Sequence, residues 1–165
     1  MFDIKVTTTI HQRDCGPTCL KMLLDYHGID SDMESLRSEC NVSIAGCSMA
    51  DLKRTGEKYG LDIKAYLMDA EELAMQDRPA IVSWMHNHFI VFGGVDDFGK
   101  VIIVDPDRGR TRMPVYDFKK LYTGYAIFNG EPESMPMNTV QDIAEVAYIN
   151  AEYNAVLLDM MMEVI

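Results

Sequence analysis

Long apolar stretches are missing from this chain of 165 residues. No segment reaches the roughly 18 uninterrupted apolar residues that a membrane-spanning helix needs. Residues 1–5 also lack the basic start and apolar core of a secretory signal peptide. The nucleotide-binding pattern G-x-x-x-x-G-K-[ST] is missing from the sequence as well. We therefore expect neither membrane insertion nor an ATPase site in this chain.

Positive charge is scarce. Lys and Arg number 15 against 26 Asp and Glu, which gives a formal net charge of −11. Residues 131–165 contain seven of the acids and no Lys or Arg, so residues 1–130 carry only −4. An acidic chain is poorly suited to binding phosphate backbones, and we expect no nucleic-acid partner.

Cysteine occurs at only four positions, namely Cys15, Cys19, Cys40 and Cys47. A disulfide framework is typical of small secreted proteins, and nothing in the sequence indicates secretion. Cys15 and Cys19 lie four residues apart on one predicted helix, where a disulfide would block both thiols. We expect four reduced thiols and a cytoplasmic location.

Helical patterns come first along the chain and strand patterns second. We expect helices at about 15–27, 32–40, 49–59 and 70–76, a strand or extended segment at 4–10, and a strand at 61–67. From Pro79 onward, β-branched and aromatic runs predict strands at 80–85, 88–95, 101–104, 111–115 and 125–128, with a short helix at 116–121. Helices followed by an antiparallel sheet define an α+β fold.

The expected domain covers residues 1–129. The following segment, 130–138, contains Gly130, Pro132 and Pro136 and is typical of a linker. Residues 139–165 carry apolar side chains at helical spacing among acidic ones, which predicts an acidic amphipathic helix. The sequence does not assign a role to that helix.

The most informative segment is Gln12-Arg13-Asp14-Cys15-Gly16. Cysteine is nucleophilic as the thiolate, and a helix N-terminus favours the thiolate through its unpaired N–H groups and partial positive charge. Cys15 is predicted to begin a helix, so it is a candidate nucleophile. Gln12 could donate its side-chain amide to an oxyanion, together with the N–H of Cys15.

A candidate base and its partner lie far downstream. His88 begins a predicted strand, and Asp105 ends the next strand after a four-residue turn. In an antiparallel pair these two positions meet at one end of the sheet, so Asp105 can orient the His88 ring. A cysteine, a histidine, a carboxylate and an amide donor are the components of a thiol peptidase.

In this order, the residues resemble the C39 family of cysteine peptidases, the bacteriocin-processing domains at the N-terminus of certain ABC transporters. The resemblance covers roughly residues 7–128. The motifs that carry it are Gln12…Asp14-Cys15-Gly16, Ser35-Leu36-Arg37, Gly46-Cys47-Ser48-Met49-Ala50-Asp51-Leu52, Tyr59-Gly60-Leu61, Arg78-Pro79-Ala80-Ile81, Asn87-His88-Phe89-Ile90-Val91 and Asp105-Pro106…Gly109.

The resemblance implies a papain-like fold with Cys15 as nucleophile, His88 as general base and acid, Asp105 as orienting group and Gln12 in the oxyanion hole. It implies an endopeptidase that cleaves leader peptides after a Gly-Gly pair and needs no cofactor or metal. The implied partners are a precursor peptide and an ABC transporter. The leader would bind as an amphipathic helix in an apolar groove. Candidate substrate-binding residues, for which core packing is the alternative, are Met49, Leu52, Tyr66, Met68 and Trp84.

Several alternatives stay open. His86 and His88, with Asp105 or Cys15, could hold zinc. The chain could bind leader peptides without cutting them, or it could transfer an acyl group to an amine with the same triad. The helix expected at 139–165 could pack on its own domain, on a second copy of the chain or in the leader groove.

Overall fold

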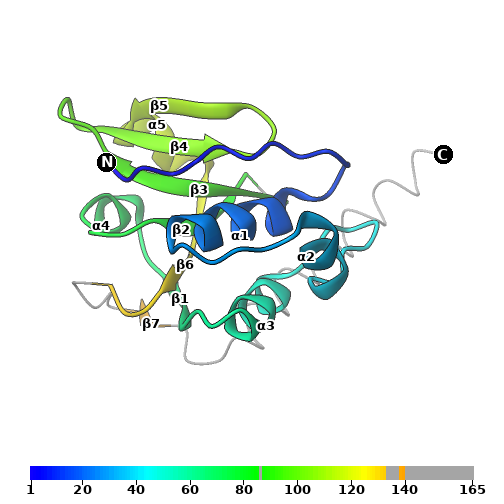
Figure 1. The fold of residues 1–165 in the computed structure, drawn as a ribbon. Coiled ribbons are helices and arrows are strands. Elements are labelled where there is room, and N and C mark those ends of the chain that lie inside the picture. The colour runs from blue at the N-terminus through cyan, green and yellow to red at the C-terminus, as the bar shows by residue number, and fades with distance from the viewer. Residues whose placement is uncertain (86, 133–137, 140–165) are drawn as a thin grey trace.

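The computed structural model describes residues 1–85, 87–132 and 138–139 (Figure 1). Within these residues a seven-stranded antiparallel sheet has the order β5-β4-β3-β2-β6-β1-β7. Its strands are β1 (Ile63–Leu67), β2 (Ala80–Trp84), β3 (His88–Val95), β4 (Lys100–Asp105), β5 (Gly109–Pro114), β6 (Tyr122–Asn129) and β7 (Asn138–Thr139). The helices are α1 (Cys15–Tyr26), α2 (Met33–Glu39), α3 (Met49–Lys58), α4 (Ala70–Ala74) and α5 (Val115–Leu121). The expected α+β class is confirmed.

Local sequence signals explain where the helices begin. Ser48 and Asp51 form reciprocal hydrogen bonds at the start of α3, and Asp69 and Glu72 do the same at α4. Asp32 caps α2 with its carboxylate. These side chains accept hydrogen bonds from N–H groups that the first turn of a helix leaves unpaired. The helix starts expected at these positions are therefore confirmed.

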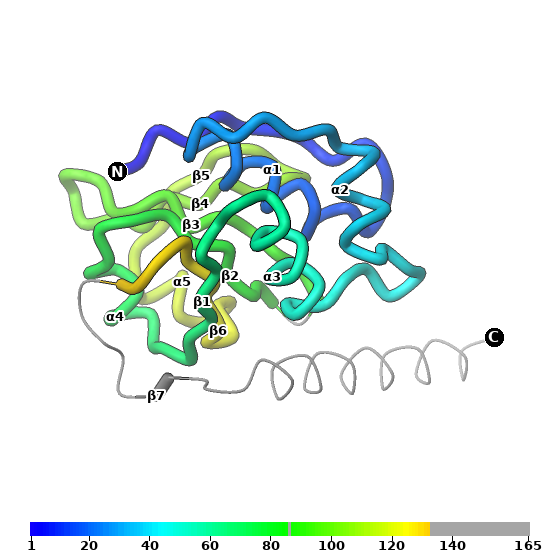
Figure 2. The backbone as a smooth tube through the Cα atoms, turned by 60° about the horizontal axis from the view of Figure 1, so that its bottom comes forward, coloured from blue at the N-terminus to red at the C-terminus, as the bar shows by residue number. Residues whose placement is uncertain are grey.

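The sheet separates two hydrophobic cores, because successive residues of a strand point to opposite faces. Helices α1, α2 and α3 cover one face, and α4 and α5 cover the other (Figures 1 and 2). In β2, Ile81 belongs to the first core while Ala80 and Val82 belong to the second. Burial on both faces fixes the register, since a shift by one residue would exchange the two sets of side chains.

The segment before α1 is extended but forms no strand. The Phe2 N–H donates to the Gly93 oxygen at 2.8 Å, and the Thr9 N–H donates to the Pro106 oxygen at 2.9 Å. Between these two points the segment runs along β3 and β4 (Figure 1). It therefore delivers the loop at 10–14, and with it the start of α1, to the end of the sheet where β4 stops.

Little of the chain beyond Pro132 is described. Asn138–Thr139 form β7, which pairs with Tyr66 and Leu67 of β1. The rest of the expected linker beyond Pro132 and of the expected helix at 139–165 lies outside the described residues. In the part of the chain that is described, no helix is both long and apolar enough to cross a membrane.

Candidate active site

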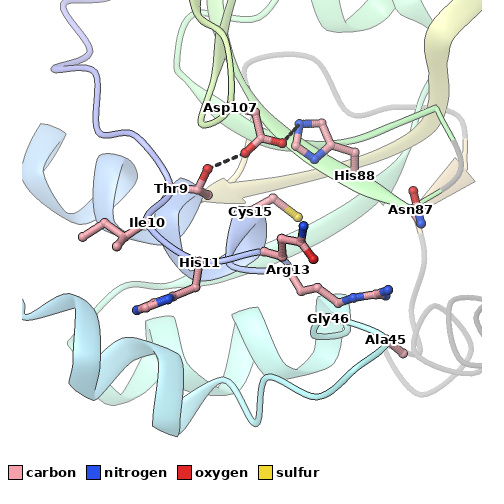
Figure 3. Close-up of a pocket in the computed structure, with 11 residues that line it drawn as sticks. Thr9, Ile10, His11, Arg13, Cys15, Ala45, Gly46, Asn87, His88 and Asp107 are labelled. Carbon is pink, nitrogen blue, oxygen red and sulfur yellow. Dashed lines mark hydrogen bonds and ion pairs between the residues drawn. The ribbon is translucent and has the colours of Figure 1, made fainter.

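Cys15 is the first residue of α1 and lies on the wall of a cavity of about 470 Å³ (Figure 3). The helix begins here because the main-chain oxygen of Asp14 accepts both the N–H and the hydroxyl of Thr18, at 2.9 and 2.7 Å. Pro17 fits the first turn, where its missing N–H costs nothing. The Cys15 side chain is partly exposed, and Figure 3 shows its sulfur beside the His88 ring.

Gly16 allows α1 to approach the chain segment before α3. A Cβ atom at position 16 would lie 2.3 Å from the sulfur of Cys47 and 3.3 Å from a methyl group of Leu52. Any side chain here would push α1 and Cys47 apart. The close approach places Gly46 and Cys47 next to the candidate nucleophile.

His88 and Asp105 come from antiparallel neighbours in the sheet. Because β3 begins at His88 and β4 ends at Asp105, both residues lie at the same end of the sheet. The distance from His88 Nε2 to Asp105 Oδ1 is 2.9 Å. With Nε2 engaged by this carboxylate, Nδ1 is the ring nitrogen left for the sulfur of Cys15. This is the orienting contact that the hairpin spacing predicts.

The contacts of His88 favour its protonated form. Burial alone would lower the pKa of this imidazole, but hydrogen bonds to Cys15 and Asp105 and the attraction of both groups outweigh burial. Together they raise the pKa from 6.5 to about 9. At neutral pH the ring is therefore an imidazolium, which is the state that stabilises a neighbouring thiolate.

The other three cysteines lie in a different environment. All four cysteines are free thiols, as expected, but Cys19, Cys40 and Cys47 are buried. Burial raises the pKa of the Cys19 thiol well above its ordinary value. The hydrogen bond with Cys40, together with burial, does the same for Cys47. Cys15 is thus the one cysteine that combines exposure with a histidine partner.

A second and narrower cavity, of about 40 Å³, meets the first at the candidate nucleophile. The two cavities share five lining residues, namely Cys15, Ala45, Gly46, Asn87 and His88. The narrow one is completed by Cys47, Ser83, Trp84, Phe89 and Thr123. The wide one is completed by Thr9, Ile10, His11, Gln12, Arg13 and Asp107. A substrate chain crossing the sulfur would therefore have a tight channel on one side and an open one on the other.

The structure brings the four predicted catalytic residues together. Gln12, Cys15 and His88 line the wide cavity, and Asp105 lies directly behind His88. Among the described residues, the side-chain amide of Gln12 has no hydrogen-bond partner. Its donor is therefore available to an oxyanion formed beside Cys15.

The predicted substrate-binding residues are placed differently. Met49, Leu52, Tyr66 and Met68 are each 3% exposed or less and pack in the two cores. As placed, they supply core packing and offer no accessible apolar groove. Trp84 is also buried, against Phe118, and it lines the narrow cavity as well.

Asp107 was not expected at the site. Its N–H donates to Asp105 Oδ1 at 2.8 Å, and its own carboxylate accepts from the Thr9 hydroxyl. One of its oxygens lies 3.9 Å from His88 Nε2 (Figure 3). The sequence does place a second aspartate two residues after Asp105, which could have indicated a second acidic group near His88. The contact that holds Asp107 there could not be predicted, because Thr9 lies 98 residues away in the sequence.

His88, Asp105 and Asp107 are also the residues that could hold a metal ion. Their ligand atoms all lie within 4.8 Å of one another. In the structure His88 Nε2 is engaged by Asp105 Oδ1, and the Asp107 carboxylate accepts a hydrogen bond from the Thr9 hydroxyl. His86, which belonged to the zinc alternative, lies outside the described residues.

A protein-family model covers most of the chain. The family described as Peptidase C39 family matches residues 3–134. The probable microcin-H47 secretion/processing ATP-binding protein MchF of Escherichia coli is 31% identical over 121 residues, covering 72% of this chain and 17% of that protein. The lactococcin-G-processing and transport ATP-binding protein LagD of Lactococcus lactis subsp. lactis is 28% identical over 123 residues, covering 71% and 17%. The chain thus spans less than a fifth of the length of these relatives.

Solved structures of peptidase domains share the fold. A double glycine motif protease from an AMS/PCAT transporter, in complex with the leader peptide, has a TM-score of 0.73 at 28% identity and covers 76% of this chain and 90% of that chain. The peptidase domain of Streptococcus ComA, a bi-functional ABC transporter involved in quorum sensing, has a TM-score of 0.71 at 26% identity and covers 76% and 96%. The expected papain-like peptidase fold is confirmed.

Proposed function

This chain belongs to the Peptidase C39 family of cysteine peptidases, and we propose that it cleaves leader peptides from precursor peptides after a Gly-Gly pair. One observation carries the proposal. A partly exposed cysteine at a helix N-terminus faces a histidine that is bonded to a buried aspartate, at the meeting point of a narrow and a wide cavity. These are the components that peptide-bond cleavage by a thiolate requires.

In the proposed reaction, the Cys15 thiolate attacks the carbonyl carbon of the second glycine. The carbonyl oxygen becomes an oxyanion that accepts hydrogen bonds from the Gln12 amide and the N–H of Cys15. The C–N bond then breaks, and the His88 imidazolium gives its proton to the leaving nitrogen. Water attacks the resulting thioester while His88 takes the proton of that water, and Cys15 leaves as the thiolate, which restores the thiolate–imidazolium pair. Asp105 holds the ring in place throughout.

The narrow cavity supports the preference for glycine. The narrow cavity has a volume of about 40 Å³, against about 470 Å³ for the wide one. Backbone without side chains fits beside it more readily than larger residues, which would meet Cys47 and Trp84. We therefore place the glycine side of the cleaved bond toward the narrow cavity and the cargo side toward the wide one.

The test is incubation with peptides that carry a leader, a Gly-Gly pair and a short cargo, with the products identified by mass. The wild-type chain should cut after the second glycine, and Cys15→Ala should yield no product while still binding the peptide. Cys40→Ala removes a buried thiol away from the cavities and is the matched control, expected to cut normally.

Two results would overturn the proposal. Intact peptides with the wild-type chain, together with a Cys15 that resists iodoacetamide at pH 7, would indicate a leader-binding module without catalysis. Products that form only when an amine such as glycinamide is added would indicate an acyl-transfer enzyme. Hydrolysis products in plain buffer separate the proposed peptidase from both.

The names of the related proteins suggest partners for this chain. MchF is a probable secretion/processing ATP-binding protein and LagD is a processing and transport ATP-binding protein, and the chain matches one part of each. We place the domain at the cytosolic face of an ABC transporter, acting on a precursor peptide whose leader binds as an amphipathic helix. Co-purification of the full chain with a transporter encoded beside it tests this placement.

A further inference from the structure

An ion pair with a buried carboxylate and a half-exposed guanidinium lies next to the candidate nucleophile in the chain. Asp14, the residue before Cys15, is 2% exposed. Its carboxylate accepts a hydrogen bond from Nε of Arg37 in α2, at 2.8 Å. The Arg37 side chain is about half exposed, at 47%, whereas that of Asp14 is only 3% exposed. The mechanism proposed above uses neither residue.

The Asp14 carboxylate does not cap the helix that it precedes. Aspartate at this position normally accepts from the N–H of the second or third helical residue, but here it makes no such bond. The third residue is Pro17, which has no N–H to offer. Within the described residues, the N–H groups of Cys15 and Gly16 have no acceptor.

Arg37 accounts for this arrangement. Its guanidinium holds the carboxylate toward α2, so the negative charge is neutralised and does not turn to the first N–H groups of α1. We propose that Arg37 is a positioning residue for the nucleophile, acting through Asp14 to reserve the N-terminus of α1 for the Cys15 sulfur and the substrate oxyanion. The part that concerns the oxyanion rests on the proposed function, while the part that concerns the thiolate does not.

Loss of Arg37 would have a definite consequence. A buried carboxylate without its partner is strongly unfavourable, and the N–H groups of Cys15 and Gly16, which have no acceptor among the described residues, follow it directly in the chain. A negative charge there competes with the thiolate for the same N–H groups and repels it. Both effects raise the pKa of the Cys15 thiol.

Other charged or ionisable groups surround Cys15 and the Asp14–Arg37 pair, and the experiment must hold them constant. On the sheet these are His88, Asp105 and Asp107. On α1 and before α3 they are the thiols Cys19 and Cys47, and in the loop before α1 they are His11 and Arg13. Beside the ion pair, at the start of α2, they are Asp32 and Glu34. All of them are unchanged in variants at positions 14 and 37.

The experiment measures the rate of Cys15 alkylation by iodoacetamide against pH, with the labelled peptide identified by mass. Arg37→Ala should move the midpoint upward by about one pH unit and lower kcat/KM by about tenfold to a hundredfold. Adding Asp14→Asn to Arg37→Ala should bring the midpoint back to within about 0.3 pH units of wild type, since no buried charge remains. Arg37→Lys keeps the charge and should lie between wild type and Arg37→Ala.

A merely structural role for Arg37 gives a different pattern. In that case Arg37→Ala would lower the melting temperature but leave the alkylation midpoint in place. An unchanged midpoint in Arg37→Ala, or a shifted midpoint that Asp14→Asn does not restore, overturns the proposal. If Arg37→Ala does not fold, the midpoint of Arg37→Lys decides, and a wild-type value there overturns the proposal. A shifted midpoint in a chain that cuts no Gly-Gly peptide would overturn the proposed function and retain the role of Arg37.

Discussion

The two cavities that meet at Cys15 differ in what their walls are made of. The narrow one, about 40 Å³, is closed by core side chains such as Trp84 and Phe89 and by the contact of Gly16 with Cys47. The wide one, about 470 Å³, is lined by the loop at 9–13 and by the turn that carries Asp107. Core packing resists expansion, whereas loop side chains can adjust. We therefore expect stringent selection on the narrow side and tolerance on the wide side.

The largest effect should come from the partner of His88, because His88 lines both cavities. Asp105→Asn removes the charge that orients His88 and should lower kcat by about 100-fold to 10,000-fold for every substrate. The alkaline limb of the pH–rate profile, set near 9 by the raised pKa of His88, should move toward neutral pH. A profile with its alkaline limb unchanged would contradict the assigned partnership.

The same variant makes a prediction about stability. Because the folded pKa of His88 lies above the ordinary 6.5, folding favours the protonated ring. That stabilisation is fully present below pH 6.5 and is lost as pH rises through about 9. The melting temperatures of wild type and Asp105→Asn should therefore differ most below pH 6.5 and converge above pH 9.

The next effect tests the narrow side through the substrate. Replacing the second glycine of the Gly-Gly pair by alanine should lower kcat/KM by at least about 100-fold, because the added methyl group has no space beside Cys47 and Trp84. A valine at the first cargo position is the matched control and should change the rate by less than about tenfold. Equal losses at both positions would remove the distinction between the cavities.

The contact between Gly16 and Cys47, which lines the narrow cavity, can be altered by substitution. Gly16→Ala places a Cβ 2.3 Å from the Cys47 sulfur and should cost about 1–3 kcal/mol of unfolding free energy, with a smaller loss of activity. Adding Cys47→Ala makes room and should recover part of that stability. Denaturant unfolding of the wild type and of the two variants measures this recovery, and a double variant no more stable than Gly16→Ala would show that the strain lies elsewhere.

Features that depend on short stretches of chain could be predicted from the sequence. Capping pairs such as Ser48 with Asp51 are local signals, and they marked the helix starts correctly. His88 and Asp105 could be brought together because a four-residue turn leaves an antiparallel hairpin few other arrangements. The core strands were predicted by their runs of β-branched residues. All of these inferences concern short stretches of chain.

Contacts between distant segments were harder to predict. Helical spacing shows that Met49 and Leu52 share a face of α3, but it does not tell whether that face meets solvent or the sheet, and they proved to be core residues. Asp107 was missed because its place at the site depends on Thr9 in a segment far away in the sequence. The linker beyond Pro132 and the helix expected at 139–165, apart from β7, lie outside the described residues.

The smallest effect is expected on the wide side. Asp107→Asn removes a carboxylate whose side chain is 55% exposed and 3.9 Å from His88 Nε2. Charges this exposed are screened by solvent, so kcat/KM should change by no more than about fivefold and the change should shrink at high salt. Peptides with an acidic first cargo residue should gain the most, because Asp107 repels them. A comparison of Lys and Glu at that position in both proteins measures the effect. A loss of 100-fold or more would instead place Asp107 beside Asp105 as a partner that His88 needs, and the wide cavity would then be as stringent as the narrow one.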